Sequence, residues 1–174
     1  ADDFLIMFQY ENDAERVMEA LVERLNKFSL EVAVEKTRIL PFGRWKGTKE
    51  KFDFLGFTFY NTKTRIGKYR VGVMTSKKKL KAKRQEAKEW LRTRLTMPVA
   101  DTMRTLALII KGHCNYYGVN GNFKSIQKFW KYLKDSTYRM LNRRDQKGRF
   151  RYEKFNRVWN YYIEEPHLKV NIWG

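Results

Sequence analysis

The sequence predicts an α+β protein with a β-α-β unit and a β-hairpin, followed by a bundle made only of helices. Up to about Met74, apolar residues run without interruption or alternate with polar ones, which is typical of strands, with one helical stretch between them. From Ser76 onward they recur every three or four residues, which is typical of amphipathic helices. We therefore expect two domains, residues 1–75 and residues 76–174.

The first predicted strand is Phe4–Phe8, which is apolar at every position. Such a run is expected where a strand is covered on both faces and flanked on both edges. The segment begins almost at the first residue, and Ala1 is not an initiator Met. We therefore expect the neighbouring strands to belong to sequence that precedes this chain, which would make it a fragment.

The next elements complete the predicted β-α-β unit. Asn12 and Glu15 have the spacing of a capping box, and apolar residues then recur at helical intervals to about Phe28. Alternation over Leu30–Val34 predicts a second strand, and Ile39-Leu40 continue its extended character.

A β-hairpin is predicted next, with strands at 52–60 and 69–74 and a polar turn between them. Gly56 stands in the middle of the first strand. A glycine there often marks a bulge or the close approach of another backbone. Simple tolerance at a sheet edge explains it equally well.

Four helices are predicted after the hairpin. Ser76 caps the first, which Pro98 closes. The second runs from about Ala100 to Gly118, and the third from about Phe123 to Asn142. A shorter fourth helix gathers Phe155, Val158, Trp159 and Tyr162 on one face.

Charge is divided unevenly along the chain. Nine basic and eleven acidic side chains lie within residues 1–60, which leaves 28 basic and eight acidic ones for the remainder. The first part is therefore near −2 and the second near +20. Such segregation predicts a polyanionic partner, and nucleic acid is the first candidate. A basic surface without a partner is the alternative.

Cysteine and histidine are scarce. Cys114 is a single cysteine, so it forms no internal disulfide, and two histidines cannot complete a structural zinc site. We expect His113 to be a packed core residue. No secretory signal or membrane-spanning run is evident, which predicts a reducing, cytosol-like compartment and no membrane partner.

Adjacent carboxylates, Asp2 and Asp3, stand at the start of the first predicted strand. Carboxylates are hard oxygen ligands for Mg²⁺, and paired ions can hold the attacking and leaving oxygens of a phosphoryl transfer. Two adjacent acids are weak evidence when taken alone, because most such pairs are solvated or cap a turn.

Basic residues are concentrated on two of the predicted helices. Lys77-Lys78-Lys79 stand at a helix start, where the macrodipole disfavours cations, so an external anion such as a phosphate would offset that cost. The same helix continues with Lys81, Lys83, Arg84 and Lys88, and the third helix carries Lys124, Lys128, Lys131 and Arg139 opposite its apolar face. A solvated basic face is the alternative.

Two further groups of residues could act on nucleic acid. Five aromatic residues could stack on unpaired bases, although core packing is the better interpretation for the two tryptophans: Tyr116, Tyr117, Trp130, Trp159 and Tyr161. Lys36, after the second predicted strand, could stabilise the charge of a leaving pyrophosphate or donate a proton to it.

Several blocks of this sequence resemble group II intron reverse transcriptases, in order and spacing. The late palm blocks are matched by Ala1-Asp2-Asp3-Phe4, Leu25–Leu30, Glu35–Arg38 and Phe54–Phe59. The blocks Gly112–Tyr117 and Phe129–Leu133 resemble the thumb, or maturase domain X, of the same proteins. The resemblance covers essentially the whole chain.

The resemblance implies a partial polymerase palm over residues 1–75 and a thumb/maturase helical bundle over residues 76–174. It implies an Mg²⁺-dependent, RNA-directed DNA polymerase that binds group II intron RNA and an RNA template with a DNA primer, and that assists RNA splicing and retrohoming. Asp2 and Asp3 would be catalytic and metal-binding, and Lys36 would be catalytic. Leu55 and Gly56 would lie against the primer. Other nucleic-acid contacts would come from Lys77, Lys78, Lys79, Lys81, Arg84, Lys88, Lys124, Lys128, Lys131 and Arg139.

The chain also departs from the family pattern. Ser29 stands where the family commonly has Gly, and the Tyr that usually precedes Ala1 is missing. The fingers and the earlier palm strand, with its own metal-binding Asp, are missing too, so we expect them as a partner and expect this chain alone to be inactive. The resemblance implies a bacterial cytoplasmic or an organellar location.

Two alternatives remain open. The first is a stand-alone RNA-binding splicing factor without polymerase activity, in which the acids bind no metal. The second is a basic DNA-binding domain, for which the sequence has neither a helix-turn-helix nor a finger pattern.

Overall fold

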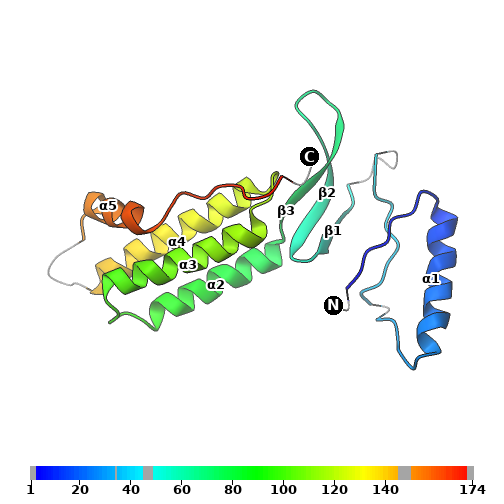
Figure 1. Ribbon diagram of the computed structural model, residues 1–174, viewed down its shortest axis with the longest axis horizontal. Helices are drawn as coiled ribbons and strands as arrows, with labels where there is room; N and C mark the ends of the chain where they lie inside the picture. Colours follow the sequence, from blue (N-terminus) through cyan, green and yellow to red (C-terminus); the bar gives the residue numbers. More distant parts are fainter. Residues whose placement is uncertain (1–2, 34, 45–48, 145–149, 172–174) are drawn as a thin grey trace. The chain divides into compact units, whose positions relative to one another are not determined.

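The computed structural model describes residues 3–33, 35–44, 49–144 and 150–171. Within them the elements are, in chain order, α1 (Glu11–Asn26), β1 (Lys51–Phe54), β2 (Phe57–Lys63), β3 (Tyr69–Thr75), α2 (Lys77–Arg92), α3 (Val99–Tyr117), α4 (Phe123–Arg144) and α5 (Tyr152–Tyr162) (Figure 1). The strands form one antiparallel sheet in the order β1-β2-β3. The predicted α+β class is confirmed.

The chain divides into two compact units. The first comprises residues 1–55 and 60–71, and the second comprises residues 56–59 and 72–174. The start of β2 and the end of β3 therefore pack with the helices that follow them.

Helix α1 dominates the first unit, but it begins differently from the prediction. Its N-cap is Tyr10, which makes no side-chain capping bond. The prediction of a capping box at Asn12 is therefore wrong. At the other end, the Ser29 N–H bonds the Asn26 carbonyl at 3.1 Å and the Leu30 N–H bonds the Leu25 carbonyl at 3.0 Å. This is a Schellman motif, and its left-handed residue is Ser29, with φ of 55°.

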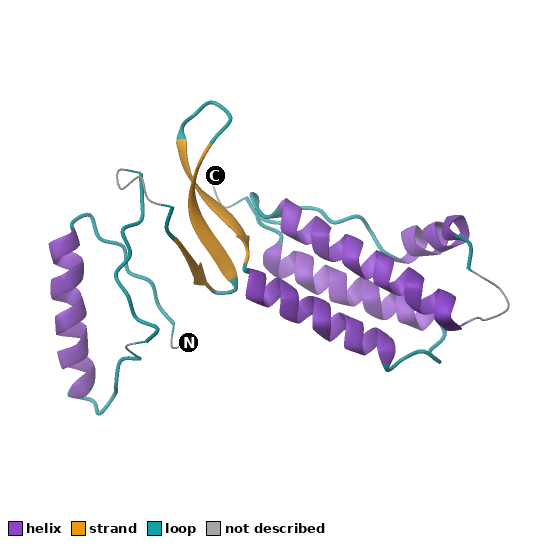
Figure 2. Ribbon diagram, turned by 180° about the vertical axis from the view of Figure 1, so that it is seen from behind, coloured by secondary structure: helices purple, strands orange, loops and turns teal. Residues whose placement is uncertain are grey.

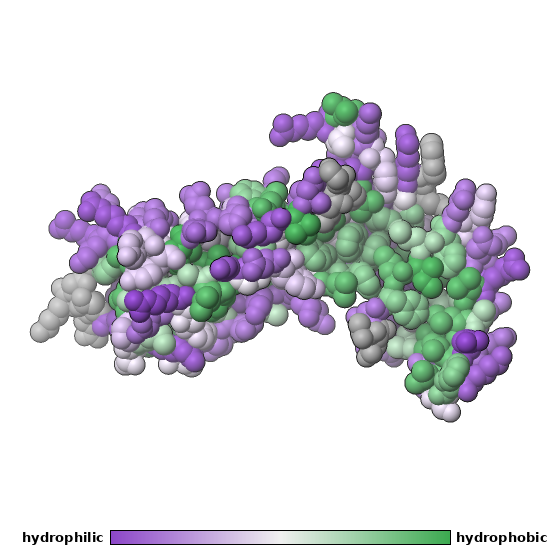
Figure 3. Space-filling model, in the orientation of Figure 1, coloured by the Kyte–Doolittle hydropathy of each residue, from purple (hydrophilic) through white to green (hydrophobic). Residues whose placement is uncertain are grey.

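The predicted β-α-β unit does not form within the described residues. Residues 4–8 are not a strand, and their side chains are exposed, with Phe4 61% and Met7 88% accessible. Residues 30–33 and 39–40 are not strands either, and Val34 lies outside the described residues. A strand needs a neighbour to accept its hydrogen bonds, and the described sheet contains only β1, β2 and β3. Apolar side chains therefore gather on the surface of this unit (Figure 3).

The strand predicted over residues 52–60 is in fact two strands. Leu55 and Gly56 form the turn between β1 and β2, with φ of 47° and 79°. Positive φ at both central residues is what a two-residue type I′ hairpin turn requires. The bend at Gly56 turns the predicted hairpin into a three-stranded meander, in which the β2–β3 hairpin is confirmed.

Helices α2 to α5 form the core of the second unit (Figure 2). Helix α4 packs against α2, α3 and α5, and α3 also packs against α5. The innermost side chains, almost or wholly without solvent contact, are Met103, Leu106, Ile126, Phe129, Leu133, Phe155 and Trp159. The four helices predicted after the hairpin are confirmed.

One boundary of the bundle was predicted wrongly, because α2 stops at Arg92 and not near Pro98. The Thr93 hydroxyl donates to the carbonyls of Glu89 and Trp90, both at 3.1 Å. This side chain competes with continuation of the helix.

Candidate nucleic-acid interface

The N-terminus of α2 carries three consecutive exposed cations. The Ser76 hydroxyl oxygen accepts a hydrogen bond from the Lys79 N–H at 3.3 Å, which confirms the predicted cap. The first turn contains no acidic residue, and the side chains of Lys77, Lys78 and Lys79 are exposed. The helix macrodipole disfavours cations here by about 0.3–1 kcal/mol each, so a bound anion would stabilise this helix end.

Helix periodicity arranges the α2 cations on two flanks. At 100° per residue, Lys77, Lys81, Arg84 and Lys88 fall within one stripe beside the buried face. Lys83 lies on the other flank and pairs with Glu86 at 2.9 Å. The stripe therefore keeps its positive charge, whereas the other flank is partly neutralised.

A second row of cations lies on α4. Lys124, Lys128, Lys131 and Arg139 are all exposed, while Phe129 and Leu133 are buried. The predicted division of α4 into an apolar and a basic face is confirmed. Among the described residues, none of these four cations lies within salt-bridge distance of a carboxylate.

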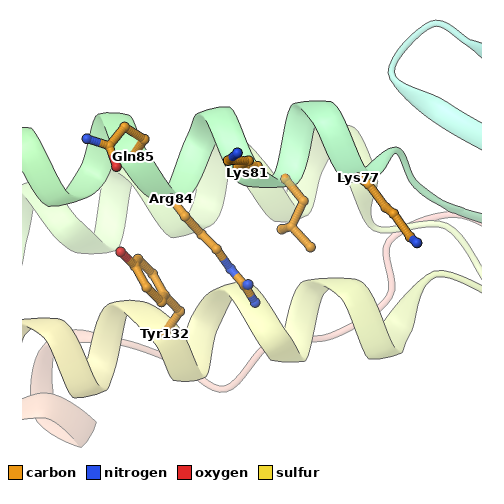
Figure 4. A pocket seen from close by; sticks show the side chains of 6 residues that line it. Lys77, Lys81, Arg84, Gln85 and Tyr132 are labelled. Carbon is orange, nitrogen blue, oxygen red and sulfur yellow. The ribbon is translucent and has the colours of Figure 1, made fainter.

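An open cleft of about 390 Å³ lies between α2 and α4, called here the α2–α4 cleft (Figure 4). Its lining consists of Lys77, Leu80, Lys81, Arg84, Gln85 and Tyr132. Three of the predicted nucleic-acid contacts therefore line it. Sequence reasoning missed Tyr132, Gln85 and Leu80, because nothing in the periodicity of one helix shows which residues of another helix face it.

Arg84 is held in place within this cleft. Its Cζ atom lies 5.1 Å from the centroid of the Tyr132 ring, and its Nη2 atom donates to the Lys128 carbonyl at 3.2 Å. The first contact is a cation–π interaction. Arg84 thus bridges α2 and α4 and orders the middle of the basic surface.

Asn122 joins the beginnings of the two cleft helices. It is fully buried, accepts from the Thr75 N–H at 2.7 Å, and donates to the Tyr117 carbonyl at 2.9 Å. Thr75 lies two residues before α2, and Asn122 immediately precedes α4. This buried contact, which no sequence signal predicted, ties the N-terminal ends of the cleft helices together.

The hairpin turn at Gly56 packs on the end of α3. A Cβ added to Gly56 would stand 2.7 Å from the Tyr117 hydroxyl, and the Gly56 carbonyl accepts from the Ser76 N–H at 2.9 Å. Phe57 stacks on Tyr116, with 5.9 Å between ring centroids and 13° between planes. One of the two interpretations of Gly56, the close approach of another part of the chain, is confirmed. The approaching group is the Tyr117 side chain and not a backbone segment. Leu55, the other residue of the turn, is exposed.

The predicted catalytic residues are only partly described. Asp2 lies outside the described residues, Asp3 is exposed, and Lys36 is exposed in a turn where its N–H bonds the Ala33 carbonyl at 2.9 Å. No group of three or more His, Cys, Asp or Glu side chains gathers anywhere in the described part of the chain.

The candidate stacking residues separate by exposure. Trp159 is completely buried and Tyr117 nearly so. Trp130 is half-buried, and its Nε1 atom donates to the Glu164 carbonyl at 3.2 Å. Core packing is therefore confirmed for Trp159 and, at the edge of the core, for Trp130. Of the five candidates, only Tyr116 and Tyr161 present large exposed rings.

His113 is a core residue, as predicted. Its ring lies between Tyr117, at 4.7 Å between ring centroids, and Phe129, at 4.2 Å. Neither ring nitrogen has a hydrogen-bond partner among the described residues. Burial, and secondarily the positive charge of Lys83, lower the pKa of His113 to about 4. The imidazole is therefore neutral at physiological pH.

Fold and surface together define an α+β protein whose helical unit presents a basic face. Two family models match this chain. Residues 1–59 match reverse transcriptase (RNA-dependent DNA polymerase), and residues 80–159 match the group II intron, maturase-specific domain. The two matches cover most of the sequence in the expected order, so the chain belongs to the group II intron reverse transcriptase/maturase family.

Comparison with the curated proteins and with the solved structures gave no match. In the described part of the chain, every helix is too short or too polar to cross a lipid bilayer.

Proposed function

We propose that this chain binds group II intron RNA through the basic face formed by α2 and α4. The observation that carries the proposal is a cleft between α2 and α4 that Lys77, Lys81 and Arg84 of α2 line, together with the row of exposed cations on α4. Most of these residues lie within the match to the maturase-specific domain. Each phosphate that such a surface neutralises releases counterions, which favours association at low salt.

In the complete protein, this binding would serve RNA-directed DNA synthesis, RNA splicing and retrohoming. Residues 1–75 would be palm and residues 76–174 thumb, with Leu55 and Gly56 against the primer of a primer–template duplex. The reverse transcriptase family generally uses Mg²⁺, and Asp2 and Asp3 are the acids that the resemblance assigns to it. The fingers and the remaining palm would be supplied by further sequence of the same protein.

The chain by itself would bind RNA without polymerising DNA. A stand-alone RNA-binding splicing factor is the second candidate function. A single-turnover primer-extension assay with Mg²⁺ tests the point, and templated nucleotide addition by this chain would show it to be wrong.

Charge reversal tests the RNA-binding face. Changing Lys124, Lys128 and Lys131 to Glu should weaken binding to structured RNA and lower the log–log salt slope by about 2–3, at roughly 0.9 for each lost duplex phosphate contact. Because the three side chains are exposed, the helical circular dichroism should not change.

A matched control has the same net charge. Lys111, Lys154 and Arg157 are exposed on α3 and α5, and their reversal to Glu should affect RNA affinity much less. Equal losses in both triple variants would mean that overall charge, and not the α4 face, controls binding. Equal affinity for structured RNA and for duplex DNA of the same length would favour the basic DNA-binding alternative.

A further inference from the structure

We propose that the α2–α4 cleft binds a single unpaired nucleotide of RNA. The inference rests on the proposed RNA-binding function and assigns it a ligand. A volume of about 390 Å³ lies at the lower end of the range for small-molecule sites, roughly 300–1,000 Å³. One extruded nucleotide therefore fits the space between the two helices better than an RNA duplex does.

The cleft contains a preformed surface for stacking. Arg84 lies over the Tyr132 ring at 5.1 Å, and its bond to the Lys128 carbonyl at 3.2 Å holds the guanidinium in place. Unpaired bases stack on aromatic rings and on arginine guanidinium planes. Because Arg84 is already ordered, binding loses less side-chain freedom than it would on a mobile arginine.

Cations at one end of the cleft can hold the phosphate. Lys77 and Lys81 are four residues apart, one helical turn, and both line the cleft in Figure 4. Neither has a carboxylate within salt-bridge distance among the described residues. A nucleotide with its base near Tyr132 could therefore direct its phosphate toward the start of α2, where it would also offset the macrodipole cost.

Polar groups beside the stack can contact the base edge. Gln85 donates through Nε2 to Glu89 at 3.1 Å, which leaves its amide oxygen as an acceptor. The Tyr132 hydroxyl has no hydrogen-bond partner in the described part of the chain. A base with an exocyclic amino group, such as adenine, supplies a donor for the Gln85 oxygen.

Geometry also explains why the base must be unpaired. In A-form RNA the major groove is too deep and narrow for side chains to read, and the shallow minor groove is recognised mostly by its shape, so base-specific contacts go mainly to unpaired bases. Tyr132 and Gln85 line the α2–α4 cleft, and a base that has left its helix can reach both of them there.

A bulged RNA tests the proposal. Fluorescence anisotropy would compare an RNA duplex carrying one bulged adenosine with the same duplex lacking the bulge, at a single salt concentration. The unaltered chain should bind the bulged RNA about tenfold more tightly, as expected from one stacked base. Tyr132→Ala should abolish that preference, and Gln85→Ala should reduce it.

Controls separate a binding role from a folding role. Gln85 is exposed, so its replacement by Ala leaves the bundle folded even if Tyr132→Ala does not. Gln127→Ala changes an exposed glutamine of α4 that does not line the cleft, and should keep the full preference.

Two outcomes would overturn different statements. Equal affinity of the unaltered chain for both RNAs, with both still weakened by reversal of Lys124, Lys128 and Lys131, would exclude the nucleotide site and leave RNA binding intact. No binding to either RNA would instead overturn the proposed function itself.

Discussion

The hydroxyl of Tyr117 occupies the place that a side chain on residue 56 would need. A Cβ built on Gly56 stands 2.7 Å from that oxygen, well inside normal contact, and the backbone there has φ of 79°. Two independent constraints therefore require glycine at the turn between β1 and β2. The contact also connects Gly56, within the residues that match reverse transcriptase, to Tyr117, within those that match the maturase-specific domain.

Gly56→Ala should destabilise the protein by more than backbone strain alone. The left-handed conformation costs an L-residue about 1–2 kcal/mol, and displacement of Tyr117 adds to it. Gly67→Ala is the matched control, because Gly67 has φ of 78° with open space around its would-be Cβ. Urea denaturation should show a larger loss for Gly56→Ala, and Tyr117→Phe should recover part of the difference. Equal losses for the two glycines would contradict the contact.

Asn122→Ala should cost about 1–3 kcal/mol of unfolding free energy. The change leaves the buried Thr75 N–H without its partner, whereas the Tyr117 carbonyl keeps the bond from the Val119 N–H at 2.8 Å. Thermal unfolding measures the loss. Asn115→Ala, at an exposed position of α3, should have almost no effect, and similar melting temperatures for the two variants would refute the role of Asn122.

Ser29→Gly should stabilise the first unit by about 1 kcal/mol. Ser29 has φ of 55° in the Schellman motif after α1, and glycine adopts this conformation without steric cost. Amide hydrogen exchange in α1 measures the gain. Ser29→Ala is the control, since alanine meets the same strain and should give no protection.

Stability should decrease as the pH falls below about 6.5, because of His113. The folded state lowers the pKa of this residue to about 4, so the unfolded chain binds the proton first. Between pH 7 and pH 5 the loss should be about 2 kcal/mol from this residue, and it should level off below pH 4. Denaturation of His113→Phe over the same range should lack this part of the pH dependence. An unchanged pH profile in His113→Phe would assign the effect to other groups.

Helices were predictable because their hydrogen bonds are internal to the segment. In α4, the spacing of Phe129 and Leu133 against Lys128 and Lys131 was enough to separate the buried face from the exposed one. The Ser76 cap was equally local, since it concerns atoms three residues apart. Family membership was also readable from short blocks of sequence.

Strands were not predictable in the same way, because each depends on a neighbour. Residues 4–8 have the composition of a buried strand, yet they form none among the described residues, where no other strand pairs with them. The segment around Gly56 was mispredicted for a similar reason. Its sequence predicts one strand, and only the positive φ of Leu55 and Gly56 in the structure shows that the chain reverses there.

Sequence alone therefore determined the fold class, the four helices after the hairpin, the exposed cations and the family. Tertiary structure decided how the two basic helices meet. Tyr132 of α4 faces Arg84 of α2 over a separation of 48 residues, and Asn122 contacts Thr75 over a separation of 47. Periodicity defines the faces of one helix, whereas the meeting of two faces depends on the packing of the whole bundle.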